Sequence, residues 1–133
     1  MVANAERGEA VRAAEILREA GLAVEVVSVG STPTAVVVED LTGVTELRPG
    51  NYALFDLFQA SIGSCNTQDI ALSVLTEVIG VYPERAQILV DAGALAMSKD
   101  PGATHVPGVS GFGQVCDIDG EWLEGLSLIG LSQ

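Results

Sequence analysis

The chain has 133 residues, enough for one domain and too few for two large ones, and its 18 acidic and 6 basic side chains give a net charge of −12. Because nucleic acid is bound through a basic face, this balance argues against it as a partner. Although 48% of the residues are hydrophobic, the apolar runs are far shorter than the about 20 residues that span a membrane, and the first twelve residues contain no apolar signal core. We therefore expect a soluble, cytoplasmic protein with no membrane partner.

The first half of the chain alternates helical and strand patterns. Apolar residues recur at helical spacing over 4–20, and Gly21 stands where a helix C-cap is expected. Residues 22–29 are apolar on nearly both faces, as in a parallel strand covered by helices. A short helix over 34–41 and a strand over 44–47 follow. This order predicts part of an α/β layer fold.

A small hydroxyl-rich turn, Gly30-Ser31-Thr32-Pro33-Thr34, connects the strand to the short helix. Glycine permits an unusual backbone conformation, Thr32 suits the N-cap, and Pro33 suits the first helical position. The hydroxyls and free backbone N–H groups at a helix start can hold a phosphate. From spacing alone, an ordinary capped helix start is the simpler interpretation.

After residues 60–66 the pattern changes to short strands separated by turn signals rich in proline, glycine and aspartate. The expected strands cover 70–82, 86–90, 94–97, 113–117 and 122–129, and they predict an antiparallel β region. The first region holds only about two βα units, whereas a βα barrel has eight. The chain therefore has the character of a fragment.

The two cysteines, Cys65 and Cys116, have neither the number nor the spacing of a disulfide framework or a zinc ligand set. Small buried apolar side chains are the simplest interpretation of both.

Three ordered blocks, 27–34, 44–56 and 90–100, resemble the D-serine dehydratase-like and D-threonine aldolase-like family, and the match spans nearly the whole chain. The resemblance implies an alanine racemase-type fold. Residues 1–62 would be the last βα units of a TIM-type barrel that binds pyridoxal 5′-phosphate. Residues 63–133 would be most of a C-terminal antiparallel β domain. The expected fold class is thus α/β followed by β, with both domains incomplete.

By this resemblance, Gly30, Ser31 and Thr32 would hold the cofactor phosphate at the barrel mouth, where phosphates commonly bind in this architecture. Tyr52 would face the cofactor, although a tyrosine packed at the domain junction is an equal alternative. Arg48 and Asp56 could orient cofactor or substrate groups, but local structural pairing is the simpler role for each.

The groups that perform the family's chemistry are not expected in this chain. The Schiff-base lysine of the family lies upstream, and Lys99, the only lysine here, falls in a turn-like segment. The full-length relatives use a divalent metal such as zinc, whose ligands would follow the last residues of this chain. His105 lies in a proline- and glycine-rich loop and is expected to be solvated. No catalytic residue and no metal ligand is therefore assigned.

The resemblance implies a fragment of a pyridoxal-phosphate-dependent, metal-assisted D-amino-acid lyase of the D-serine dehydratase or D-threonine aldolase type, inactive alone. The complete protein would act on small β-hydroxy-D-amino acids and form a homodimer. The alternative is a non-enzymatic remnant that binds a phosphate group and mediates dimerisation or assembly with a separate N-terminal half.

Overall fold

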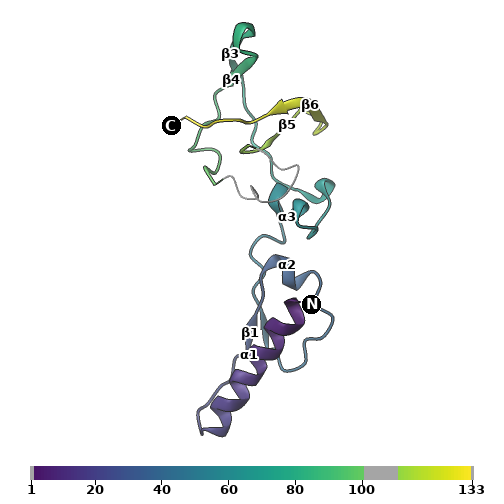
Figure 1. The fold of residues 1–133 in the computed structure, drawn as a ribbon, viewed down its shortest axis with the longest axis vertical. Helices are drawn as coiled ribbons and strands as arrows, with labels where there is room; N and C mark the ends of the chain where they lie inside the picture. Colours follow the sequence, from purple (N-terminus) through teal and green to yellow (C-terminus); the bar gives the residue numbers. More distant parts are fainter. Residues whose placement is uncertain (1, 101–110, 133) are drawn as a thin grey trace. The chain divides into compact units, whose positions relative to one another are not determined.

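A computed structural model describes residues 2–100 and 111–132 of the chain. It divides into two compact units, Met1–Ala71 and Leu72–Gln133 (Figure 1). The sequence placed a boundary at 62/63, a little before this division. The assignment of residues 1–62 to a barrel and of 63–133 to a β domain stays a prediction. His105 lies outside the described residues.

The first unit begins with the helix α1 (Val2–Glu19), which confirms the helix expected over 4–20. The helix ends before Gly21, whose φ of +82° is the left-handed conformation typical of a C-cap glycine. Ala3 and Ala14 of this helix are buried, as are Val27 and Val29 of the segment that follows. These four small side chains form the core of the first unit.

Strand β1 (Ser28–Val29) lies beside α1 (Figure 1) and pairs in parallel with β2 (Glu46–Leu47). Their pairing confirms the parallel α/β arrangement, but β1 is much shorter than the strand expected over 22–29. A strand forms only where its backbone is hydrogen-bonded to a neighbouring strand. In the described chain β1 has one neighbour, β2, and the hydrogen bonds between the two segments begin at Val27.

The helix expected over 34–41 is only partly correct. Helix α2 covers Thr32–Ala35 and gives way to an irregular segment at Val36, where three consecutive β-branched valines begin. A further short helix, α3 (Leu57–Ser61), and a 3₁₀ turn, η1 (Thr67–Asp69), complete the unit.

The described residues of the second unit form two antiparallel hairpins, which confirms the predicted β character. Strand β3 (Val78–Tyr82) pairs with β4 (Gln87–Val90) across the 3₁₀ turn η2 (Pro83–Arg85), and β5 (Gln114–Cys116) pairs with β6 (Trp122–Ser127). The strand expected over 70–82 begins only at Val78. The strand expected over 94–97 is wrong, because the N–H groups of Ala96 and Met97 both bond to the Gly93 carbonyl and form a turn.

None of the described residues between 72 and 132 is buried. Large apolar side chains of the β3–β4 hairpin are exposed, for example Ile79 at 59% and Val81 at 63%. In the described part of the chain, no helix combines the length and apolar character needed to cross a bilayer.

Candidate functional site

The loops that follow β1 and β2 lie against each other at the carboxyl ends of these strands. The Arg48 N–H donates to the Val29 carbonyl at 3.0 Å, and the Asn51 N–H donates to Thr32 Oγ1 at 2.9 Å. The structure thus brings the Gly30–Thr34 turn and the Arg48–Tyr52 block together. Ligands of parallel α/β folds characteristically bind at this edge.

The start of α2 is capped by Ser31, and the expected N-cap at Thr32 is therefore wrong by one residue. Ser31 Oγ accepts from the Thr34 N–H at 3.5 Å, and Thr34 Oγ1 accepts from the Ser31 N–H at 3.1 Å. This reciprocal pair is a capping box in which threonine takes the place of glutamate. The Ser31 amide is consequently bonded, whereas its side chain is exposed.

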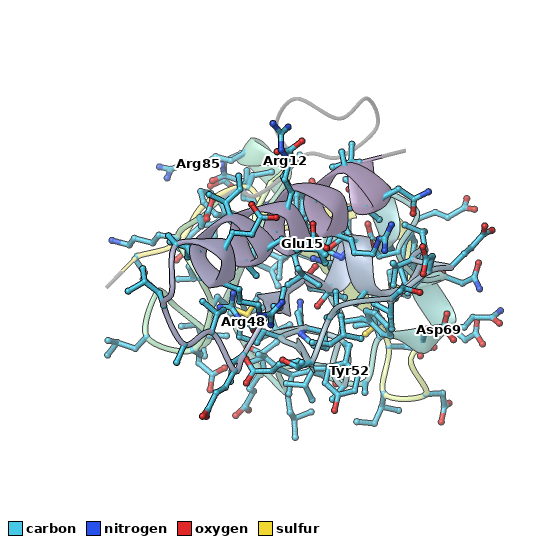
Figure 2. All side chains as sticks on the ribbon, turned by 90° about the horizontal axis from the view of Figure 1, so that it is seen from below. Arg12, Glu15, Arg48, Tyr52, Asp69 and Arg85 are labelled. Carbon is cyan, nitrogen blue, oxygen red and sulfur yellow. The ribbon has the colours of Figure 1, made fainter. Side chains whose placement is uncertain are left out.

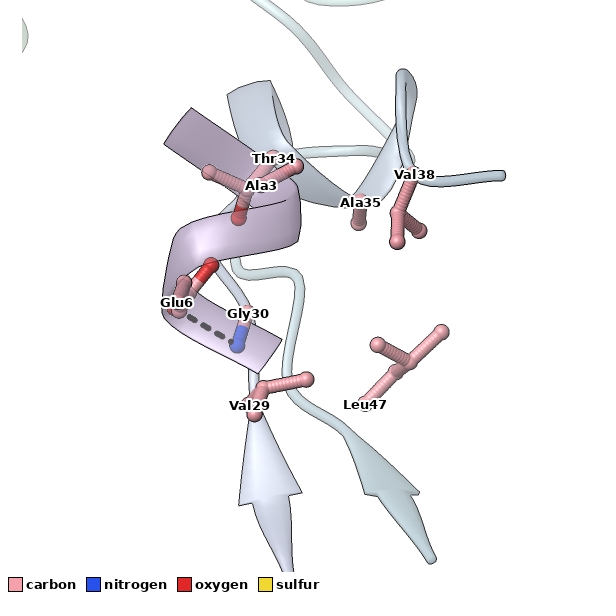
Figure 3. A pocket seen from close by; sticks show the side chains of 8 residues that line it. All are labelled: Ala3, Glu6, Val29, Gly30, Thr34, Ala35, Val38 and Leu47. Carbon is pink, nitrogen blue, oxygen red and sulfur yellow. Dashed lines mark hydrogen bonds between the residues drawn. The ribbon is translucent and has the colours of Figure 1, made fainter. Parts of the chain in front are cut away.

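Gly30 occupies a conformation that other residues rarely adopt. Its φ is +120°, and a Cβ built on it would lie 3.2 Å from the Arg48 backbone nitrogen. Its N–H donates to Glu6 Oε1 of α1 at 3.1 Å (Figure 3). The expectation of free N–H groups in this turn is therefore wrong for both Gly30 and Ser31.

A small cavity lies beneath this turn, lined by Ala3, Glu6, Val29, Gly30, Thr34, Ala35, Val38 and Leu47 (Figure 3). It offers about 10 Å³ to a water-sized sphere, which is room for about one water molecule. A phosphate group does not fit inside it. Any phosphate at this turn would have to lie on the exposed side, next to the Ser31 hydroxyl.

Thr32 is 3% exposed, and its hydroxyl accepts the Asn51 N–H. The hydroxyl is thus committed to joining the two loops, and Thr32 can approach a phosphate only through its backbone N–H. The first N–H groups of a helix have no acceptor within the helix. Pro33 has no N–H, and the Thr34 N–H is bonded to Ser31 Oγ. The exposed Ser31 hydroxyl and the Thr32 N–H are therefore the donors that fit one phosphate group.

Tyr52 follows Asn51 in the loop after β2, and its side chain is exposed. In Figure 2, Arg12 projects from one side of α1, whereas Arg48 and Tyr52 lie on the other side. Tyr52 is 57% exposed and so presents an accessible ring and hydroxyl. Its predicted orientation toward a cofactor stays a prediction.

Arg48 and Asp56 both have local partners, as the simpler interpretation of each predicted. Arg48 Nε donates to Ser28 Oγ at 2.6 Å and lies 3.6 Å from Glu46 Oε1, and Ser28 Oγ also bonds to Glu46. Asp56 caps α3 by accepting the Gln59 N–H at 2.8 Å, and it accepts from Asn51 Nδ2 at 2.6 Å. Asp56 is thus a structural residue of the second loop.

The cysteines are less buried than expected, because Cys65 and Cys116 are free thiols of intermediate exposure. Desolvation, followed by the nearby charges of Asp69 and Asp56, raises the pKa of the Cys65 thiol, which disfavours the reactive thiolate. Lys99 is exposed in a bend, as expected. Among residues 2–100 and 111–132, no group of three or more His, Cys, Asp or Glu side chains is placed to hold a metal ion.

Glu6 is the residue of this site that the sequence did not reveal. Its contact joins residues 24 positions apart, and a glutamate on an amphipathic helix is ordinarily a solvated surface residue. The sequence offered one indication. Residues three positions apart lie on the same side of a helix, and Glu6 lies three positions after Ala3, which is buried.

Comparison with known proteins assigns the chain to a class. Residues 71–133 match the family described as "Putative serine dehydratase domain". The chain is 49% identical to D-threo-3-hydroxyaspartate dehydratase of Delftia sp. (strain HT23) over 99% of its own length and 35% of that protein. It is 45% identical to D-serine dehydratase of Dictyostelium discoideum over 68% of its length and 24% of that protein.

Solved structures give the same result. A histidine-to-alanine variant of D-threo-3-hydroxyaspartate dehydratase superposes with a TM-score of 0.93 at 49% identity, over 99% of this chain and 34% of that one. An alanine racemase-like protein from Idiomarina loihiensis superposes with a TM-score of 0.84 at 44% identity, over 90% of this chain and 32% of that one.

The chain belongs to the D-serine dehydratase-like family, whose solved structures include alanine racemase-like proteins. The predicted resemblance is thereby confirmed. The chain spans about a third of the Delftia protein and about a quarter of the Dictyostelium protein.

Proposed function

We propose that this chain provides the phosphate-binding end of a pyridoxal 5′-phosphate barrel and most of the adjoining β domain of a D-amino-acid lyase. The observation that carries the proposal is the 49% identity to a D-threo-3-hydroxyaspartate dehydratase, which extends over 99% of the chain, including the Gly30–Thr34 turn. The junction of this turn with the loop after β2 supports it, because parallel strands deliver phosphate-binding loops to this edge.

Within this proposal, each residue of the turn has a distinct task. Ser31 donates its exposed hydroxyl to the phosphate, and Thr32 donates its backbone N–H while its hydroxyl fixes the second loop. Gly30 lets the backbone pass close to Arg48. Tyr52 presents its ring or hydroxyl to the cofactor. The bound cofactor would supply the electron sink that lyase chemistry at an α-carbon requires.

We further propose elimination of water from a β-hydroxy-D-amino acid, rather than retro-aldol cleavage. The similar proteins of known activity are named as dehydratases, and a metal such as zinc would activate the β-hydroxyl. The metal ligands and the cofactor lysine would come from outside these 133 residues, since Lys99 is an exposed bend residue. The chain alone would therefore be inactive.

A chimera tests this proposal. Residues 1–133 replace the corresponding third of the Delftia dehydratase, and we expect the chimera to retain pyridoxal 5′-phosphate and to dehydrate D-threo-3-hydroxyaspartate. Ser31→Ala should weaken cofactor binding by about tenfold, the size expected for one hydrogen bond to a charged group. Ser73→Ala, which removes another exposed hydroxyl, should have no effect. A folded chimera that does not bind the cofactor would contradict the proposal.

The chain alone provides a second test. Mixed with pyridoxal 5′-phosphate and D-serine, it should show no turnover, and borohydride should trap no stoichiometric adduct. Turnover together with specific labelling of Lys99 would contradict the assignment of the cofactor lysine to another part of the polypeptide.

A second candidate function is a non-enzymatic module that binds a phosphate group and assembles with another copy or with a separate N-terminal half. The exposed apolar hairpin β3–β4 favours it, with Ile79 at 59% and Ile88 at 50% exposure. Cofactor binding without catalysis in the chimera, together with stable association of the chain, would support this module over the lyase.

A further inference from the structure

Glu6 makes a contact that ties the first helix to the candidate phosphate turn. Its Oε1 accepts the Gly30 N–H at 3.1 Å in a partly buried setting, and the residue lines the small cavity under the turn (Figure 3). A carboxylate that accepts a backbone N–H forms a charge-assisted bond, which is stronger than a bond between neutral groups.

This bond restrains the peptide that leads into Gly30, the residue of the turn whose conformation is least constrained by its type. Glycine has access to a wide range of backbone angles, and Gly30 is held at a φ of +120°. The orientation of the Val29–Gly30 peptide sets the direction in which the chain enters Ser31. The Arg48 N–H holds the Val29 carbonyl of this same peptide, and Thr34 Oγ1 holds the Ser31 amide. Glu6, from helix α1, provides the second restraint on this peptide by accepting its N–H.

We propose that Glu6 is a positioning residue of the phosphate turn, which it preorganises by holding the Gly30 amide. The inference rests on the proposed function, because it assigns the turn to the cofactor phosphate. Preorganisation improves binding by lowering the ordering that the ligand must impose. A carboxylate near an anion site would otherwise weaken binding by repulsion, so the two roles predict opposite effects when the side chain is removed.

The experiment compares Glu6→Ala, Glu6→Gln and the control Glu15→Ala, which removes an exposed carboxylate of the same helix. Each is made in the active chimera, and circular dichroism verifies folding. The first readout is hydrogen exchange of the Gly30 amide by NMR without cofactor. The second is the dissociation constant of pyridoxal 5′-phosphate. The third is the ³¹P chemical shift of the bound phosphate.

We expect Glu6→Ala to speed hydrogen exchange of the Gly30 amide about tenfold. It should raise the dissociation constant of pyridoxal 5′-phosphate by about the same factor, the size expected for loss of one charge-assisted hydrogen bond. Glu6→Gln retains an oxygen acceptor and should rescue most of both effects, with the ³¹P shift returning to that of the parent. Glu15→Ala should change none of the three readouts.

Tighter cofactor binding in both Glu6 variants would overturn the inference and identify Glu6 as a competing anion. An unchanged dissociation constant in Glu6→Ala would also overturn it. If the parent chimera itself binds no cofactor, the proposed function fails first, and the amide exchange then reports only on the structural bond.

Discussion

At the scale of single residues, Gly30 is the most constrained position of the candidate site. Its φ of +120° favours glycine, its Cβ position lies 3.2 Å from the Arg48 nitrogen, and its N–H is bonded to Glu6. A side chain here would have to overcome both the backbone preference and the close approach of the loop after β2. The residue type therefore follows from the backbone, independently of any ligand.

Gly30→Ala should destabilise the protein by about 1–3 kcal/mol, the usual cost of a strained backbone conformation. Gly8→Ala is the matched control, because Gly8 lies within α1 and a Cβ there meets nothing within 4 Å. Since glycine is a poor helix former, this control should stabilise by up to about 1 kcal/mol. Urea denaturation followed by circular dichroism measures both. Similar effects of the two substitutions would contradict the role given to Gly30.

The local part of the site could be predicted from the sequence, and the long-range part could not. Small hydroxyl residues after an apolar run indicated a capped turn, and the capping box of Ser31 and Thr34 has this local origin. The Thr32 hydroxyl, by contrast, is occupied by Asn51, and Gly30 is bonded to Glu6. A local sequence pattern cannot predict either partner, because only tertiary packing brings Asn51 to Thr32 and Glu6 to Gly30.

At the scale of elements, periodic patterns predicted the helix α1 and the hairpins well and overestimated the strands. Helix α1 satisfies its own backbone, so its sequence is sufficient to predict it. A strand needs a neighbour, and the mainly apolar segment 22–26 pairs with no strand in the described chain. The segment 94–97 shows the same limit, since its apolar composition suited a strand but the N–H groups of Ala96 and Met97 both bond to the Gly93 carbonyl.

Asp91 closes the β3–β4 hairpin through a pH-dependent contact. It accepts from the Thr76 hydroxyl at 2.7 Å and from the Glu77 N–H at 2.9 Å, and these bonds lower the pKa of its carboxyl. A lowered pKa means that the ionised form stabilises the hairpin above the unfolded value of about 3.9, and that this contribution is lost as the pH falls through the folded pKa.

Carboxyl NMR should therefore give Asp91 a titration midpoint below about 3.9, with loss of β3–β4 contacts on acidification. Thr76→Val should move the pKa of Asp91 upward, because it removes the largest cause of the shift. Thr76→Ser keeps the hydroxyl and should leave the midpoint nearly unchanged. An Asp91 midpoint that does not respond to Thr76→Val would contradict the assignment.

At the scale of the whole molecule, the described residues enclose little apolar core and leave much apolar surface. Among residues 2–100 and 111–132, the buried apolar residues are Ala3, Ala14, Val27 and Val29. The chain as a whole matches about a third of the length of the Delftia protein. Exposed apolar area on this scale is typical of an interface with another polypeptide or another part of the same one. Hydropathy alone did not predict this exposed surface, because whether an apolar strand residue is buried depends on which segments pack against the strand.

The paired positions Val81 and Ile88 test this interpretation, since they face each other across the hairpin and are 63% and 50% exposed. We expect the chain alone to associate with itself as its concentration rises, as measured by size-exclusion chromatography with light scattering. Burying two such side chains contributes about 3 kcal/mol per copy, so the double variant Val81→Thr/Ile88→Thr should weaken association by more than about a hundredfold. Val2→Thr changes an apolar side chain of α1 that is 76% exposed, and it should leave association unchanged if the hairpin is the interface. If the chain remains monomeric at all concentrations, with or without the hairpin substitutions, the exposed hairpin is not an interface between copies. The observation that favours an assembly module would then be lost.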